Sequence, residues 1–266
     1  MTTALRPPRS DWETYHRVSR TATFGFLAAL PLIITYELLV VFANRDAVAE
    51  IRVGAELWLK QLLAVVGAPG LTAFGALVVI VGLGIVWAER RKNIPLRPRY
   101  FGWMILESAV YAVLVAVIVS GLVGIILGVA SFPIQVTASD VTPPALLSGL
   151  GPGDGSLLLK VALSVGAGVY EELVFRVILV GGLFLLLRKT IGRSSMAYFI
   201  AAIVGALLFS LVHYLGPLGD AFSTSSFLFR FLFGLMLNVL YLLRGFGVAA
   251  WTHALYDIMV VIWFGG

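Results

Sequence analysis

The 266-residue sequence contains no cysteine, which excludes a disulfide framework, a thiolate metal site and a cysteine nucleophile. Charged residues are also scarce, at 12% of the chain against about 25% in a typical soluble domain. Hydrophobic residues make up 60% of the chain, and the mean hydropathy is +0.98. These proportions indicate an integral membrane protein. The net charge of +5 is typical of the Lys and Arg in cytoplasmic loops and does not indicate nucleic-acid binding.

Apolar runs long enough to cross a membrane recur along the chain, since about 20 residues span a hydrocarbon core of ~30 Å. A shorter amphipathic stretch at 55–66 is expected to lie at the membrane interface. The first run is too long for a signal-peptide core and is expected to remain as an anchor. The sequence thus predicts an all-α polytopic membrane helix bundle of about seven transmembrane helices plus one short interfacial helix. The predicted spans are 22–43, 70–87, 103–130, 157–187, 196–214, 226–243 and 248–264.

The distribution of basic residues predicts the orientation of these spans. With a cytoplasmic N-terminus, the inner segments hold 13 of the 19 Lys and Arg residues. This bias predicts an N-terminus inside and a C-terminus outside. We divide the chain into a polar cytoplasmic arm (1–20), a three-span region with the interfacial helix and an outer loop (21–155), and a four-helix region (156–266).

Three charged side chains interrupt the fourth predicted span, in the run from Tyr170 to Arg176. Because charges inside a membrane are costly, they require an explanation. On an α-helix Glu172 and Arg176 are four residues apart and can form an ion pair. Glu171 points about 100° away from Glu172, and such a carboxylate suits proton transfer. The alternative is a buried ion-pair cluster that fixes helix register, which would explain Glu172 and Arg176 but not Glu171.

The sequence has only three histidines. His16 lies in the polar arm and is expected to be solvated. His213 and His253 both lie in apolar spans, where a single histidine often makes only a helix–helix hydrogen bond. Asp257 follows His253 by four residues, so both side chains are expected on one helix face. Two intramembrane histidines, this His-xxx-Asp pair and Glu171 together favour a site of chemistry.

The depth of these residues can be estimated from the turns between spans. Glu171 and His213 each lie 21 residues from Gly192, the centre of a predicted turn, so an antiparallel hairpin brings them to one depth. His253 is only nine residues from Arg244 and is expected about 10 Å or more closer to the cytoplasmic side. A recessed turn at Arg244, or a hairpin that projects beyond the bilayer, would remove this difference.

Three further polar residues in the spans have structural interpretations. Glu37 is expected to make a helix–helix hydrogen bond or to lie near the outer interface, with the site cavity as an alternative. Asn238 is expected to bond between helices, with a substrate contact as an alternative. Arg230 is expected to extend toward the outer boundary of the membrane.

Three motifs, each within an apolar span, occur in order: Glu-Glu-xxx-Arg at 171–176, Phe209 to His213, and His253 to Asp257. This ordered set resembles the CPBP (Abi) family of intramembrane proteases, which includes the type II CAAX prenyl endopeptidases. The similarity covers 156–264 and makes 156–266 a CPBP-like catalytic region. It implies an intramembrane endopeptidase acting on a membrane-associated protein or a lipidated peptide, with the lipid bilayer as its surroundings and no nucleic-acid partner.

The resemblance also implies roles for single residues. Glu171 would activate a water as general base, and His213 would help hold and polarise that water. His253 and Asp257 would stabilise the oxyanion or orient the group that does so. Asp257 stands where the CAAX endopeptidases have Asn, and an ionised carboxylate cannot donate to an oxyanion. Asp257 therefore fits an orienting or a metal-binding role better.

The supporting residues and the cofactor complete the hypothesis. The resemblance makes Glu172 and Arg176 a supporting ion pair. Glu171, His213, His253 and Asp257 are chemically a zinc-type ligand set, and a Glu-activated water without metal is the interpretation we favour. Two alternative functions use the same buried residues: a bacteriocin-immunity or scaffold protein without enzymatic activity, and a proton-relay transporter.

Overall fold

The computed structural model describes residues 10–43, 52–65, 71–92, 94–128, 154–215 and 219–264. Within these ranges the chain is helical and contains no strand. The first half comprises α1 (Asp11–Val18), α2 (Ala22–Ala43), α3 (Gly54–Val65), α4 (Leu71–Glu89), a short 3₁₀ turn (Arg90–Lys92) and α5 (Pro98–Ile126). The second half comprises α7 (Asp154–Gly166), two π-helical segments (Ala167–Glu171 and Leu173–Val180), α8 (Gly181–Ile191), α9 (Ser194–Val212), α10 (Thr224–Arg244) and α11 (Phe246–Phe264).

Five of these helices are long and apolar enough to cross a membrane: α2, α5, α9, α10 and α11. This confirms the polytopic helical membrane protein, while the number of seven spans stays a prediction. The second predicted span is present as α4. The fourth forms one helical rod in which α7, the π-helical segments and α8 follow one another. Residues 131–153 of the predicted outer loop, 131–155, lie outside the described residues.

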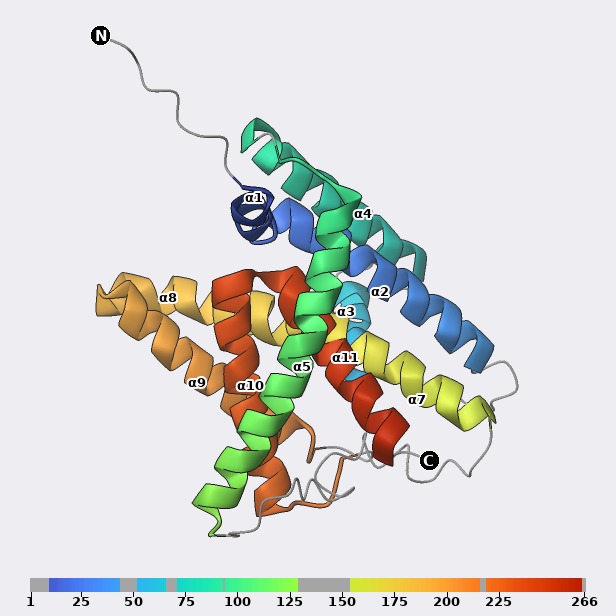
Figure 1. Cartoon of the computed structure of the whole chain (residues 1–266), viewed down its shortest axis with the longest axis vertical. Coiled ribbons are helices and arrows are strands. Elements are labelled where there is room, and N and C mark those ends of the chain that lie inside the picture. The colour runs from blue at the N-terminus through green and yellow to red at the C-terminus, as the bar shows by residue number, and fades with distance from the viewer. Residues whose placement is uncertain are drawn as a thin grey trace.

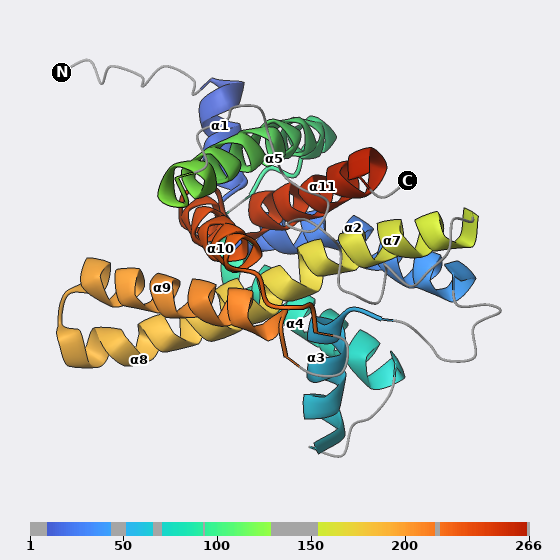
Figure 2. The same ribbon diagram turned by 90° about the horizontal axis from the view of Figure 1, so that it is seen from below.

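Helix α11 lies at the centre of the bundle. It packs against α2, α5, α7 and α10 and against the first π-helical segment, and its position among these helices is seen in both views (Figures 1 and 2). Small residues on its face, Val248, Ala249, Ala250 and Ala254, are fully buried. Small side chains allow helix backbones to approach closely, so α11 can carry His253 into the middle of the bundle.

The N-terminal arm contains a helix that the sequence analysis did not predict. Ser10 caps α1 by accepting a hydrogen bond from the Glu13 amide. Tyr15 and Val18 are buried, and the Tyr15 hydroxyl donates to Glu107 of α5. His16, expected to be solvated, is half-buried with its ring against those of Trp12 and Tyr15. Eight residues are too few to show a periodic apolar face, and the partner of Tyr15 is distant in sequence.

Helix α3 is found where the interfacial helix was predicted. Its apolar side chains Trp58, Leu62 and Val65 are exposed, as expected for a helix at a membrane interface. Its second feature was not predicted: Glu56 is completely buried. The helix therefore also contributes a charged side chain to the interior of the bundle.

Candidate active site

The charged run lies in π-helix and not in the α-helix assumed from sequence. The two π-helical segments meet at Glu172. Such segments are rare and occur frequently at functional sites. Gly168 explains how this one packs, because a Cβ at that position would lie 2.5 Å from the Cβ of Ala254 and 2.7 Å from the Ala250 carbonyl oxygen. The missing side chain allows the segment to lie directly against α11.

Glu172 joins the two halves of the site. Its Oε2 lies 3.0 Å from Arg176 Nε, so the predicted ion pair forms. Its Oε1 lies 2.8 Å from His253 Nδ1, a contact that the sequence analysis did not foresee. A carboxylate in this position accepts, so Nδ1 carries the hydrogen. Glu172 and Arg176 are buried, at 0% and 1% exposed, and this bridge fixes the orientation of the imidazole.

The second nitrogen of His253 faces two further carboxylates. Its Nε2 lies 3.5 Å from Asp257 Oδ2 and 3.9 Å from Glu171 Oε2. The side chains of Asp257 and Glu171 are 28% and 17% exposed, so both reach the surface of the protein. Three carboxylates thus surround one imidazole, with Arg176 as the nearby guanidinium. The group holds more acid than base and is therefore suited to taking up a proton.

His213 approaches the same site from the end of α9. Its Nδ1 lies 2.7 Å from the Phe209 carbonyl oxygen, which can only accept, so Nε2 of the neutral ring is the acceptor. The Phe209 ring packs edge-on against His213 at 5.1 Å and against His253 at 6.0 Å. The structure places both imidazoles around one aromatic ring, and it records no direct hydrogen bond between His213 and a carboxylate among the described residues.

Phe209 also supports the ion pair. The guanidinium carbon of Arg176 lies 4.5 Å from the centre of the Phe209 ring, in a cation–π contact. Arg176 Nη2 reaches the Gly234 carbonyl of α10 at 3.4 Å. The phenylalanine of the Phe-xxx-His motif therefore contacts both Arg176 and the two histidines.

The expected depth difference between His253 and Glu171 is wrong, because the structure brings the two side chains together. A recessed turn before α11, one of the two explanations considered from sequence, is present, while the position of the hairpin relative to the bilayer stays a prediction. Arg244 is buried and donates to Glu107 at 2.6 Å, so the turn before α11 is held inside the protein. The α8–α9 hairpin, in turn, projects away from the other helices (Figures 1 and 2).

The loop after His213 is tied to α10. The Asp220 amide donates to the His213 carbonyl at 2.8 Å, and Arg230 pairs with the Asp220 carboxylate at 2.5 Å. Arg230 is only 9% exposed. Its partner lies in a loop that the periodicity of the spans does not reveal, and its position relative to the membrane boundary stays a prediction.

The other two polar residues behave as their structural interpretations predicted. Asn238 donates to the Ala202 carbonyl of α9 at 3.0 Å, an interhelical bond. Glu37 pairs with Arg52 at 3.1 Å and accepts from the Tyr170 hydroxyl at 3.5 Å, so it makes contacts between helices.

A metal ion does not fit the described donor set. In the part of the chain that the structure describes, no three His, Asp or Glu side chains are arranged to hold one. The Nδ1 contacts of His253 with Glu172 and of His213 with the Phe209 carbonyl leave both Nε2 atoms available, as in many metal-binding histidines, so the fit is judged from the arrangement of the side chains alone. We therefore derive no step through a metal.

Comparison with known proteins identifies the region that holds this site. Residues 153–259 match the family described as type II CAAX prenyl endopeptidase, Rce1-like. No curated protein and no solved structure matches the chain. The matched segment contains Glu171, Glu172, Arg176, His213, His253 and Asp257. The similarity to the Rce1-like type II CAAX prenyl endopeptidase family is thus confined to residues 153–259, the part of the chain that holds the candidate site.

Proposed function

We propose that this protein is an intramembrane endopeptidase that cleaves a membrane-associated, prenylated peptide with a water activated by Glu171. The observation that carries the proposal is the cluster at His253, where Glu171 and Asp257 face one imidazole nitrogen and Glu172 holds the other. The match to the Rce1-like family supplies the reaction class and the prenylated substrate.

The proposed mechanism assigns the proton transfer to Glu171. Its carboxylate accepts a proton from a water molecule as that water attacks the scissile carbonyl carbon, and later returns the proton to the leaving amine. Since Glu171 and His253 Nε2 are 3.9 Å apart, they do not bond directly to each other. Water or substrate oxygen can therefore contact both groups.

The imidazoles support the two oxygen atoms of the reaction. Glu172 holds His253 so that Nε2 faces the space beside Glu171, and the protonated ring can donate from there to the developing oxyanion. Asp257 steadies that nitrogen at 3.5 Å, which is the orienting role. His213, with Nε2 as acceptor, is proposed to hold the attacking water.

The alternatives receive no such support. An immunity or scaffold protein does not require a carboxylate facing an imidazole, and a transporter would require a path for its cargo. The matched family is one of endopeptidases. We therefore propose peptide hydrolysis and neither an immunity or scaffold role nor transport.

The test is cleavage of a farnesylated peptide ending in a CAAX sequence by the purified protein in lipid nanodiscs, read by mass spectrometry. Glu171→Gln keeps the size of the side chain but removes its basicity, and we expect kcat to fall by roughly 10²–10⁴-fold. Glu89→Gln, in which a carboxylate outside the site is changed in the same way, is the matched control and should cleave like the wild type.

Two outcomes would contradict different parts of the proposal. Full activity of Glu171→Gln, with the protein folded, would exclude Glu171 as the general base. Equal cleavage of the same peptide without the prenyl group would exclude prenyl recognition while leaving the peptidase activity in place.

A further inference from the structure

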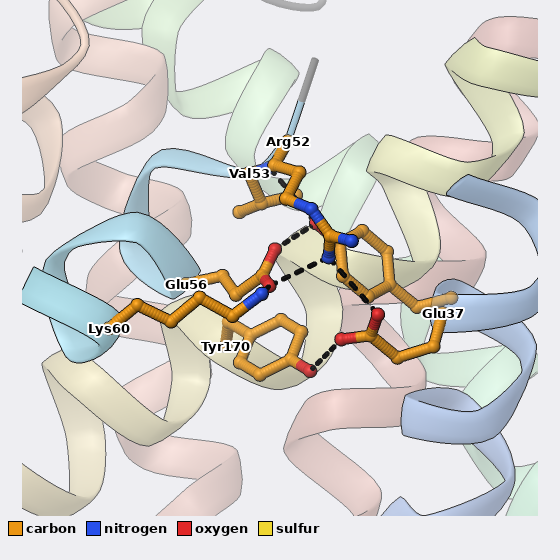
Figure 3. Close-up of polar contacts among 7 residues, drawn as sticks. Glu37, Arg52, Val53, Glu56, Lys60 and Tyr170 are labelled. Atoms are coloured by element: carbon orange, nitrogen blue, oxygen red, sulfur yellow. Dashed lines mark hydrogen bonds and ion pairs between the residues drawn. The ribbon is translucent and has the colours of Figure 1, made fainter. Parts of the chain in front are cut away.

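A second buried charged cluster lies beside the site, around Glu56 of α3. The Glu56 carboxylate receives Arg52 at 2.9 Å, and it also contacts Lys60 and the hydroxyl of Tyr36. Arg52 extends further to Glu37 at 3.1 Å. Figure 3 shows these side chains converging from α2 and α3. We call this group the Glu56 cluster; its members are Tyr36, Glu37, Arg52, Glu56 and Lys60.

The cluster contains two carboxylates and two cations, so its formal charge is balanced. Glu56 and Tyr36 are both 0% exposed, and the side chain of Arg52 is 9% exposed. Burying charges is costly unless they are paired and hydrogen-bonded, and here each has a partner. The cluster is therefore complete as it stands and requires no bound ion.

The cluster holds the helical segment that precedes Glu171 at two points. The rings of Tyr36 and Tyr170 pack edge-on at 5.2 Å. The Tyr170 hydroxyl donates to Glu37 at 3.5 Å, a contact drawn in Figure 3. One turn earlier, a Cβ at Gly166 would lie 2.5 Å from the Tyr36 ring. Tyr36 therefore packs directly on the backbone of this segment.

Tyr36 is itself fixed by hydrogen bonds at its far end. Its hydroxyl donates to Glu56 and accepts from the Val53 amide at 3.2 Å. Both partners belong to α3 or to the residue just before it. The tyrosine thus connects α3 to the π-helical segment through one rigid side chain.

Glu171 needs such support because its own side chain has no short contact. Among the described residues its recorded ion-pair contact is with His253 Nε2, at 3.9 Å, so the backbone decides where the carboxylate points. On one side Gly168 rests on α11, and on the other Tyr170 rests on the Glu56 cluster. A π-helical segment is rare as an isolated conformation and must be stabilised by such contacts.

We propose that the Glu56 cluster positions Glu171, with Tyr36 and Tyr170 as the residues that transmit its hold to the π-helical segment. This inference rests on the proposed function, in which Glu171 is the general base. It makes α3, which lies outside the matched residues 153–259, a part of the working site. The residues of the cluster are positioning residues and do not contact the substrate.

The alternative is that the Glu56 cluster only stabilises the fold. The energetics of buried ion pairs argue against this as its sole role. Replacing a buried ion pair by packed apolar side chains is often neutral or stabilising, so a charged cluster gives a helix pair little stability that apolar residues could not. What a set of directional bonds adds is a defined geometry. A misplacement of about 1 Å at a reacting group can cost roughly 10²-fold in rate.

The test is Tyr36→Phe, which removes one hydroxyl and keeps the ring that packs on Gly166 and Tyr170. We expect kcat for the farnesylated peptide to fall about tenfold while KM changes less than about twofold. The acid limb of the pH–kcat profile should shift, because Glu171 would sit differently relative to His253. Tyr170→Phe is a milder second variant and should change kcat in the same direction.

Tyr15→Phe is the matched control. Tyr15 is a buried tyrosine whose hydroxyl donates to a glutamate, Glu107, which is bound in turn by Arg244. It is thus the same kind of bond in a cluster at another place in the bundle. We expect its kcat and pH profile to equal those of the wild type, even where its melting temperature falls as much as that of Tyr36→Phe.

Hydrogen exchange of residues 166–172 gives a readout that does not depend on activity. Tyr36→Phe should exchange faster there than the wild type, and Tyr15→Phe should not. Wild-type kcat and pH profile in folded Tyr36→Phe and Tyr170→Phe, alongside inactive Glu171→Gln, would overturn the positioning role and leave the proposed function standing. Absence of cleavage by the wild type would overturn the proposed function, and unchanged exchange at 166–172 would then overturn the positioning role separately.

Discussion

Two buried charged clusters flank the dipeptide Tyr170-Glu171, and they differ in how completely they are paired. In the Glu56 cluster two acids meet two bases, and the contacts of Arg52 measure 2.9 and 3.1 Å. In the site cluster three acids meet one guanidinium and one imidazole. There the contacts begin at 2.8 and 3.0 Å around Glu172 and lengthen to 3.5 and 3.9 Å toward Asp257 and Glu171.

This difference is consistent with a positioning role for the Glu56 cluster and a catalytic role for the site cluster. Short, balanced contacts hold their members in one arrangement and leave no group to react. The longer contacts of Glu171 and Asp257 leave lone pairs available, and their side chains are 17% and 28% exposed. A general base must reach the proton it removes. Glu37 of the Glu56 cluster is also 22% exposed, but it is paired with Arg52 at 3.1 Å, whereas the charged contact of Glu171 is longer, at 3.9 Å.

The largest expected effect comes from neutralising Glu172, the site residue that contacts both Arg176 and His253. In Glu172→Gln the buried Arg176 loses its counter-charge, and breaking a buried pair costs about 3–5 kcal/mol. His253 Nδ1 also loses the carboxylate that orients it. We expect the largest loss of stability among the variants, together with a fall in kcat of about 100-fold or more. Thermal unfolding in nanodiscs and peptide cleavage measure the two effects.

The matched variant in the other cluster is Glu56→Gln. It also leaves buried cations without a full counter-charge, so its melting temperature should fall comparably. Its kcat should fall less than that of Glu172→Gln, because Glu56 acts on Glu171 only through Tyr36 and Tyr170. If the two variants lost activity equally, the division between scaffold and site would be wrong.

The sequence indicated which side chains form the candidate site better than it predicted their geometry. Each motif shows charged or imidazole groups in apolar helices, and such groups are informative because the membrane makes them costly. The pairing of Glu172 with Arg176 followed from spacing within one helix. The contact of Glu172 with His253 could not, since it depends on how α11 packs against a π-helical segment. For Asn238 the sequence likewise predicted a hydrogen bond between helices but not its partner in α9.

The Glu56 cluster shows a second limit of sequence reasoning. The amphipathic pattern of 55–66 predicted a helix at the interface, and α3 is present at Gly54–Val65. That pattern does not reveal that Glu56 is completely buried or that it contacts Arg52 and Lys60. Their burial depends on Tyr36 and Tyr170, which belong to other helices. Only tertiary packing distinguishes a solvated charged face from a buried cluster.

Asp257→Asn tests whether the surplus of carboxylates in the site cluster matters, with a smaller expected loss of stability than Glu172→Gln. The amide oxygen can still accept from His253, so the fold should remain intact, while one of the three negative charges is removed. We expect a change in kcat of about tenfold or less. The acid limb of the pH–kcat profile should shift, because a charge beside Glu171 and His253 is removed. An unchanged pH profile would contradict a shared electrostatic site.

The smallest effect on cleavage is expected from a substitution at Glu89, a paired acid outside the site. Its carboxylate accepts from the Thr23 amide at 2.8 Å and from Lys92 at 2.6 Å, so it caps the N-terminus of α2. Burial alone would raise the pKa of Glu89, but these hydrogen bonds outweigh it and lower the pKa to about 2. The stabilisation is therefore complete above the usual value near 4.5 and is lost as the pH falls toward 2.

We therefore expect the free energy of unfolding of Glu89→Gln to be roughly 0.5–2 kcal/mol below that of the wild type at pH 7. This difference in stability should shrink below about pH 4. Thermal unfolding of both proteins between pH 7 and pH 3 measures this. The cleavage rate at neutral pH should stay at the wild-type level, because a paired acid outside the site holds no proton that the reaction uses. A stability difference that grew toward low pH would show that Glu89 is not held ionised by its partners. Loss of cleavage without loss of stability would place a fully paired acid among the groups that the reaction needs, and the distinction drawn between the two clusters would then fail.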